Sequence, residues 1–527
     1  MRKMQVWRPG IVIFFGLLAA PAQDLSQVEG AALAKPDEDD MRNLSLLVRQ
    51  MMPPSLGPDL RNLNSAINRA YKAEDLTTTW RLMTRMTLAL QGQRWSDGLE
   101  ILSSYRLAIG RRLAEPGEPV VVELNPLFTL GRPLREAYTI RLSLVDDRRR
   151  TVRPAHTWEV REFAPLRHEF DTRGLKDGNY DVVYELASAS GERVAEIRRP
   201  VTVSRGVDGR LERLKQLLAR APQTAADLPT RTALETVEYL HGVMTRGRQG
   251  YFVSQRLRSH PVGARILGIE DVGRYAGEPF EFDRDLPLAE RLMAAVANKR
   301  DPLAGLTGDL RLAYRSAVDQ TLQPFRVYVP ARHKRRLVVT LHGVSGDENS
   351  YFGPFTGGLL TKLAGERGYV IASPNGRGPV GGYVGASRQD VLDVRERVVA
   401  LFGLDEKQVY LTGHSMGAMG AFQIAFEKPE LWAGLAPVAG NIGVNRRMFE
   451  KNPNMPVFLA QGGKDRLMIP SMARNVAEYA KQTLRTFEYR EYPEADHFSI
   501  GAASLRDIFD FFDRIAAAGA QAGLTPG

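Results

Sequence analysis

The stretch that decides the fold reads Val409-Tyr410-Leu411-Thr412-Gly413-His414-Ser415-Met416-Gly417-Ala418. Its first three residues are β-branched or large and apolar, which predicts a short buried strand. The small residues Ala418, Gly420 and Ala421 then predict a helix. A serine on such a tight strand-to-helix turn exposes its hydroxyl, and flanking glycines avoid a Cβ that would collide with the strand or the helix. The pattern therefore predicts a nucleophile elbow centred on Ser415.

A serine hydroxyl is a poor nucleophile near neutral pH and needs a base that a third group positions. His497 is our candidate for the base. It follows a strand predicted over 486–492, near the end of the chain, whereas the other seven histidines lie upstream of Ser415 or next to it.

The acid of such a triad lies between the serine and the histidine along the chain, in the order Ser, Asp or Glu, His. Asp465 fits this order, because it follows a strand predicted over 456–461 and precedes the next predicted helix. Asp496 is the competing candidate, but adjacent residues on an extended segment point apart. We therefore expect Ser415, Asp465 and His497 to form a catalytic triad.

An oxyanion hole requires two backbone N–H groups, one of them from the residue after the nucleophile, which is Met416. The second is expected from Val344, which follows Leu341-His342-Gly343 at the end of another predicted strand; His342 itself is expected to be structural. Tyr383 ends a glycine-rich loop over 375–383, where a substrate contact and a mobile surface loop are equally good interpretations.

The composition narrows the classes of function. The chain has 527 residues, 43% hydrophobic and 25% charged, and its net charge of +10 is dispersed. Because no motif interleaves aromatic and basic residues, nucleic-acid binding is not expected. The absence of cysteine excludes disulfides, thiolate metal sites and a cysteine nucleophile. No phosphate-binding loop or metal-ligand cluster is seen in the sequence.

The first residues predict a secretory signal peptide over 1–22. Arg2, Lys3 and Arg8 precede an apolar run over 11–20, and Ala20-Pro21-Ala22 resembles a cleavage site. We expect export to the periplasm or the extracellular space. Ten apolar residues are far fewer than the roughly 20 that span a bilayer, so no stable membrane span is expected after cleavage, although uncleaved protein would keep a loose anchor. No feature indicates an oligomeric state.

Changes in periodicity divide the rest of the chain. We expect a mainly helical segment over 23–104, an immunoglobulin-like β-sandwich over 105–204, a helical connector over 205–304, an α/β catalytic domain over 305–520 and a flexible tail over 521–527. The β-sandwich is predicted because apolar Tyr138, Ile140 and Leu142 alternate with polar neighbours, as in a strand with one buried face. No repeat of 40 to 50 residues precedes residue 300, which argues against a β-propeller.

With these motifs in place, residues 305–517 resemble the esterase and prolyl-oligopeptidase branch of the α/β-hydrolases, including polyhydroxybutyrate-depolymerase-like and feruloyl-esterase-like proteins. The resemblance rests on Gln323-Pro324-Phe325-Arg326-Val327-Tyr328-Val329-Pro330, Leu341-His342-Gly343, Gly413-His414-Ser415-Met416-Gly417, Gly463-Lys464-Asp465 and Asp496-His497. The upstream part resembles that of bacterial carboxylesterases with an immunoglobulin-like domain. The resemblance implies a cofactor-free and metal-free esterase, in which Ser415 attacks an ester of a small molecule or polymer and forms an acyl-enzyme.

Two alternatives stay open. A serine peptidase of the prolyl-oligopeptidase type uses the same triad, but such peptidases usually carry the propeller that is not seen here. A non-catalytic binding protein with a vestigial hydrolase domain is disfavoured because all three triad positions are intact. Between the strands predicted over 434–438 and 456–461 there are too few residues for a helical cap, so we expect a fairly open site, with any shielding supplied by the upstream segments or the 375–383 loop.

Overall fold

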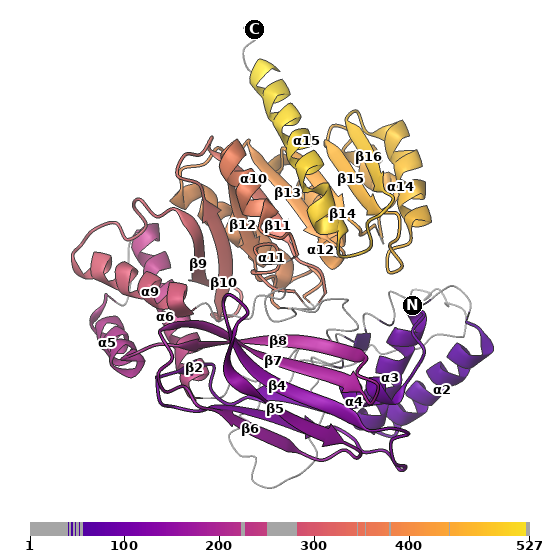
Figure 1. Ribbon diagram of the computed structural model, residues 1–527. Coiled ribbons are helices and arrows are strands. Elements are labelled where there is room, and N and C mark those ends of the chain that lie inside the picture. The colour runs from indigo at the N-terminus through magenta and orange to yellow at the C-terminus, as the bar shows by residue number, and fades with distance from the viewer. Residues whose placement is uncertain are drawn as a thin grey trace.

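The computed structural model describes residues 56–222, 227–249 and 282–522, except 345, 354, 379, 380 and 442, together with five residues between 41 and 52 (Figure 1). The predicted signal peptide and most of the predicted tail lie outside the described residues. Within these ranges, no helix is long and apolar enough to cross a membrane.

Helices α2 (Pro58–Lys72), α3 (Leu76–Leu90) and α4 (Asp97–Ser104) precede the first strand. The side chain of Asp75 caps α3 by accepting a hydrogen bond from the backbone N–H of Thr78 at 2.9 Å. The fully buried Trp80 of α3 donates its indole N–H to the carbonyl of Ser103 at 2.9 Å, which ties α3 to α4.

Eight strands follow: β1 (Tyr105–Ile109), β2 (Leu113–Ala114), β3 (Val120–Pro126), β4 (Tyr138–Asp146), β5 (Thr151–Val160), β6 (Leu166–Phe170), β7 (Gly178–Ser188) and β8 (Arg193–Val203). They form a three-stranded sheet in the order β1-β3-β6 and a five-stranded sheet in the order β2-β8-β7-β4-β5. Both sheets and the helices α2 to α4 contribute to one hydrophobic cluster, which we call the upstream core. The immunoglobulin-like relationship stays a prediction.

Helices α5 (Val207–Arg220), α6 (Leu228–Gln249) and α9 (Phe282–Ala297) connect these sheets to the C-terminal sheet. Their apolar faces share one hydrophobic cluster with that sheet. The hydroxyl of Thr236 on α6 accepts a hydrogen bond from the backbone N–H of Ala313 at 2.9 Å, which fixes the helix against the first strand of the C-terminal sheet.

The C-terminal part contains eight strands: β9 (Gly308–Arg315), β10 (Leu322–Val329), β11 (Arg336–Leu341), β12 (Tyr369–Pro374), β13 (Val409–His414), β14 (Gly434–Val438), β15 (Val457–Gly462) and β16 (Phe487–Tyr492). They form one sheet in the order β16-β15-β14-β13-β11-β12-β10-β9. Strands β11 to β16 pair in parallel. At one edge of the sheet, β10 pairs antiparallel with both β12 and β9. The loops that leave β11, β13, β15 and β16 therefore meet at one end of the sheet.

Helices cover both faces of this sheet (Figure 1). One face packs against α10 (Leu359–Arg367) and α15 (Ile500–Ala522). The other packs against α11 (Ala386–Leu401), α12 (Met416–Glu427), α13 (Arg446–Lys451) and α14 (Pro470–Thr483). Alternate residues serve the two faces, since Val409 and Leu411 lie in one cluster and Tyr410 in the other. The mixed α/β architecture predicted for this part of the chain is confirmed.

Candidate active site

Ser415 lies on a sharp turn between β13 and α12. Its φ of 56° is unusual for a residue with a side chain, and such strain persists only where the surrounding structure holds it. The close approach of the flanking segments requires glycine: a Cβ on Gly413 would lie 2.3 Å from the carbonyl oxygen of Gly417, and a Cβ on Gly417 would lie 2.1 Å from that of Leu341. The flanking glycines therefore let the chain turn tightly enough to present the hydroxyl.

The structure brings the three predicted triad residues together. The Oγ atom of Ser415 lies 3.0 Å from Nε2 of His497, and Nδ1 of His497 lies 2.8 Å from Oδ2 of Asp465. The three residues follow β13, β16 and β15, so the parallel sheet delivers them to one edge. All three are buried, with exposed fractions of 3% for Ser415, 6% for His497 and 3% for Asp465.

The loop after β15 fixes the carboxylate of Asp465. Its Oδ1 accepts hydrogen bonds from the backbone N–H groups of Leu467 at 2.9 Å and Met468 at 2.8 Å. Its other oxygen accepts one from the side-chain amide of Gln461 at 3.2 Å. These bonds hold Oδ2 toward the imidazole of His497 in a fixed orientation. Gln461 is a supporting residue that sequence reasoning missed.

Asp496, the competing acid, has a different environment. Its Oδ1 accepts hydrogen bonds from the backbone N–H groups of Phe498 at 3.0 Å and Ser499 at 2.8 Å, and from the Ser499 hydroxyl at 2.7 Å. These are the bonds of a side chain that caps the turn before α15. The geometry favours Asp465 as the partner of His497.

A second histidine belongs to the site. Nε2 of His414 donates a hydrogen bond to the backbone carbonyl of His497 at 2.6 Å, and the rings of the two residues lie 4.6 Å apart. Burial, and then the nearby His497, hold the pKa of His414 well below its ordinary value of 6.5. The ring is therefore neutral and serves as a donor. Sequence reasoning missed this role, and the only signal was its position beside Ser415.

The predicted oxyanion-hole residues lie on either side of the nucleophile. Met416 is the first residue of α12, where a backbone N–H has no acceptor within the helix. Val344 lines the cavity beside Ser415, and the preceding Gly343 packs so closely that a Cβ there would lie 3.3 Å from the Cβ of Ser415. Met416 directly follows Ser415 in the chain, and Val344 shares the cavity lining with it, so the oxyanion-hole roles of both stay a prediction.

His342 and Tyr383 lie next to residues 343 and 344. The ring nitrogen Nε2 of the buried His342 lies 2.9 Å from the carbonyl oxygen of Asn375. The hydroxyl of Tyr383 donates to the backbone carbonyl of His342 at 3.2 Å, and its ring is only 1% exposed. Tyr383 is not among the described residues that line the cavity. The structure thus places it against the backbone of His342, where burial leaves it no surface to offer a substrate.

The cavity beside Ser415 is small, with a volume of about 20 Å³. Its lining residues are His342, Gly343, Val344, Gly346, Ser350, Tyr351, Phe355, His414, Ser415, Leu467, His497 and Phe498. The expectation of a fairly open site is therefore wrong. The reason is a contact between distant parts of the chain, because Val344 and Phe498 pack against the upstream core. In addition, the guanidinium of Arg466 donates a hydrogen bond to the carbonyl of Gln91, at the end of α3, at 3.4 Å.

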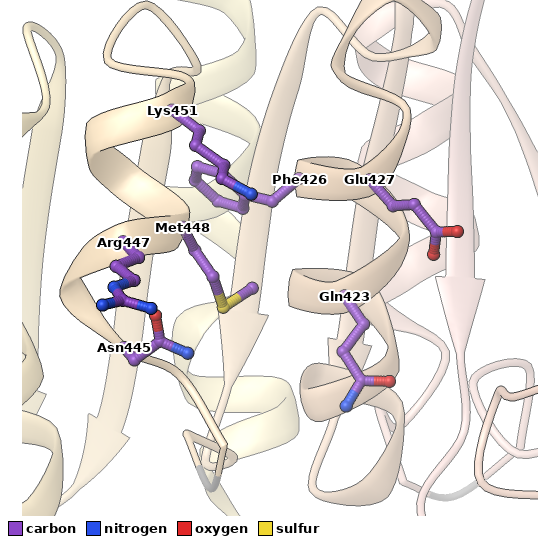
Figure 2. A pocket seen from close by; sticks show the side chains of 7 residues that line it. All are labelled: Gln423, Phe426, Glu427, Asn445, Arg447, Met448 and Lys451. Carbon is purple, nitrogen blue, oxygen red and sulfur yellow. The ribbon is translucent and has the colours of Figure 1, made fainter.

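A larger hollow of about 470 Å³ lies between α12 and α13 (Figure 2). It is lined by Gln423, Phe426, Glu427, Asn445, Arg447, Met448 and Lys451. Among the described residues, its lining shares none with the cavity beside Ser415. In the part of the chain that the structure describes, no group of three or more histidine, aspartate or glutamate side chains has the geometry to hold a metal ion.

Comparisons with known proteins were made by sequence and by structure. No family model and no curated protein matches the chain. Similar solved structures include the fluorophosphonate-binding serine hydrolase F of Staphylococcus aureus, with 17% identity over 40% of this chain and 99% of that one, at a TM-score of 0.35. An S-formylglutathione hydrolase of the same organism shares 18% identity over 40% and 97%, at 0.35. A ferulic acid esterase of Anaeromyces mucronatus shares 17% over 40% and 91%, at 0.32. These neighbours are serine hydrolases and esterases.

Proposed function

We propose that this protein is an exported serine hydrolase that cleaves carboxylic esters through Ser415, His497 and Asp465. The observation that carries the proposal is the continuous hydrogen-bonded chain from the Ser415 hydroxyl through both nitrogens of His497 to the Asp465 carboxylate, at 3.0 and 2.8 Å. An eight-stranded mixed sheet with the nucleophile on the turn after β13 further supports an α/β-hydrolase fold.

The reaction follows from these positions. His497 takes the proton of the Ser415 hydroxyl as the oxygen attacks the ester carbonyl, and Asp465 stabilises the imidazolium that forms. The tetrahedral intermediate collapses when His497 passes that proton to the leaving alcohol, which leaves an acyl group on Ser415. Water, activated by the same histidine, then attacks the acyl-enzyme and releases the carboxylic acid.

The backbone N–H groups of Met416 and Val344 are proposed to stabilise the oxyanion of each tetrahedral intermediate. Removing one such donor typically costs about 10²- to 10³-fold in kcat, so the placement of the 342–344 segment matters for the rate. His414 and Tyr383 support this arrangement from behind. His414 holds the backbone of His497, and Tyr383 holds that of His342.

The test compares hydrolysis of p-nitrophenyl acetate by the wild type, Ser415→Ala and Met448→Ala. Met448 lines the hollow between α12 and α13 and serves as the matched control. We expect Ser415→Ala to lose about 10³-fold or more of kcat and Met448→Ala to stay within about twofold. A prolyl peptide p-nitroanilide tests the peptidase alternative. Faster turnover of this peptide than of the ester would favour a serine peptidase. Folded protein that turns over neither substrate would favour the binding protein.

Export is proposed from the sequence of residues 1–22 alone. N-terminal sequencing of the protein recovered from the periplasm or the medium of a bacterial host checks it. A mature chain that begins at Gln23 supports cleavage after Ala22. Recovery only in the cytosol, with Met1 or Arg2 intact, would contradict it.

A further inference from the structure

The volume of the cavity beside Ser415 limits the size of the group that can bind there. Ligand pockets for small molecules usually measure about 300–1,000 Å³. The cavity beside Ser415 has a volume of about 20 Å³, and roughly 10–15 Å³ is the space that one water molecule needs. The free space beside Ser415 is therefore little more than one water molecule needs.

Aromatic rings make this wall. Phe498 directly follows the base, and its ring meets that of His497 edge to face, with centroids 5.3 Å apart. Phe355 packs on His414 at 4.7 Å and edge to face on Tyr351 at 5.2 Å. Phe355 is fixed from behind, because a Cβ on Gly501 would come within 2.2 Å of its ring. A close-packed wall of this kind does not yield cheaply to added methylene groups.

The side chain of Phe498 connects the cavity with the upstream core. It lines the cavity, and its apolar surface packs against the upstream core. Val344 also lines the cavity and packs against that same core. The contact of Arg466 with the carbonyl of Gln91 adds a polar link on the loop that carries Asp465. The upstream half of the chain is thus one support of the cavity wall.

We infer that the enzyme is restricted to esters of acyl groups with one or two carbons, such as formyl and acetyl, and that Phe498, backed by the upstream core, sets this limit. The inference rests on the proposed function. The acyl group is the part that the cavity must enclose, because it stays bonded to the Ser415 oxygen until water arrives, whereas the alcohol leaves toward solvent. A longer acyl chain has to displace a ring that is packed from behind.

The experiment measures kcat/KM for p-nitrophenyl acetate, butyrate and octanoate. For the wild type we expect a fall of about tenfold or more from acetate to butyrate, and a further fall to octanoate. Phe498→Ala should narrow the acetate-to-butyrate ratio by about tenfold, with Phe498→Leu in between. Met448→Ala should leave the ratio unchanged, because Met448 lines the separate hollow.

Several outcomes overturn the inference. One is wild-type hydrolysis of octanoate as fast as acetate; another is an unchanged acyl ratio in Phe498→Ala and Phe498→Leu when both still cleave acetate. A change confined to the alcohol, seen as a shift between phenyl and p-nitrophenyl acetate at a constant acyl ratio, would assign Phe498 to the leaving group instead. If no ester is cleaved and Ser415 reacts with no serine-directed inhibitor, the proposed function fails first. Circular dichroism checks that each variant folds.

Discussion

Nε2 of His414 donates a hydrogen bond to the backbone carbonyl of His497, 2.6 Å away, across 83 residues of chain. The bond joins the residue before Ser415, the proposed nucleophile, to the backbone of His497, the proposed base. Because burial holds the pKa of His414 well below 6.5, its ring is neutral near neutral pH and keeps this donor N–H. The nucleophile turn and the loop after β16 are therefore held at one fixed separation.

Loss of this bond should lower the rate without weakening substrate binding. We expect His414→Leu to reduce kcat about ten- to a hundredfold at a nearly constant KM, since a misplacement of about 1 Å can cost a factor of 10². His414→Gln keeps a side-chain N–H near the position of Nε2 and should recover part of the loss. Steady-state kinetics with p-nitrophenyl acetate measures both, and equal losses in the two variants would contradict a positioning role for the donor.

The same histidine makes the stability of the fold sensitive to acid. Its pKa in the folded chain lies well below 6.5, so the unfolded chain binds the proton first as the pH falls. The free energy of unfolding should therefore decrease below pH 6.5, by up to about 1.4 kcal/mol per pH unit, until the folded pKa is reached. His414→Gln does not titrate and should show a shallower decrease. Urea unfolding of both proteins at pH 8, 7, 6 and 5 measures the difference, and parallel curves would refute it.

The parts of the site that follow from local sequence were predictable. The elbow at Ser415 depends on a strand, two glycines and a helix within ten residues. The candidates Asp465 and His497 depend on their order along the chain and on the strands that precede them. These features need only backbone geometry and chain order, and both can be read from a single sequence.

The remaining features depend on contacts between distant segments. The open site was expected because no cap separates β14 from β15, yet Val344 and Phe498 are covered by the upstream core. Tyr383 ends a glycine-rich loop that looked exposed in sequence, and its ring is buried behind His342. No periodicity or motif encodes which surface of one half of a chain meets the other half.

The place of Tyr383 can be tested directly. Tyr383→Phe removes only the hydroxyl that donates to the carbonyl of His342. We expect a loss of about 1 kcal/mol in the free energy of unfolding and a modest fall in kcat, because residues 342–344, which carry a proposed oxyanion donor, are less firmly held. KM should not change, since the ring does not line the cavity. A raised KM at constant kcat and stability would instead indicate a substrate contact.

The two aspartates near His497 should respond very differently to the same change. Asp465→Asn presents an amide to Nδ1 of His497, which favours the wrong tautomer of the imidazole. We therefore expect kcat to fall about 10³- to 10⁴-fold. Asp496→Asn is the matched control, because its side chain caps the turn before α15 and an asparagine caps nearly as well. It should retain kcat within a fewfold. Kinetics with p-nitrophenyl acetate decides the matter: if Asp496→Asn were the more damaging change, the acid of the triad would be Asp496, and the bond between Asp465 and His497 would be structural.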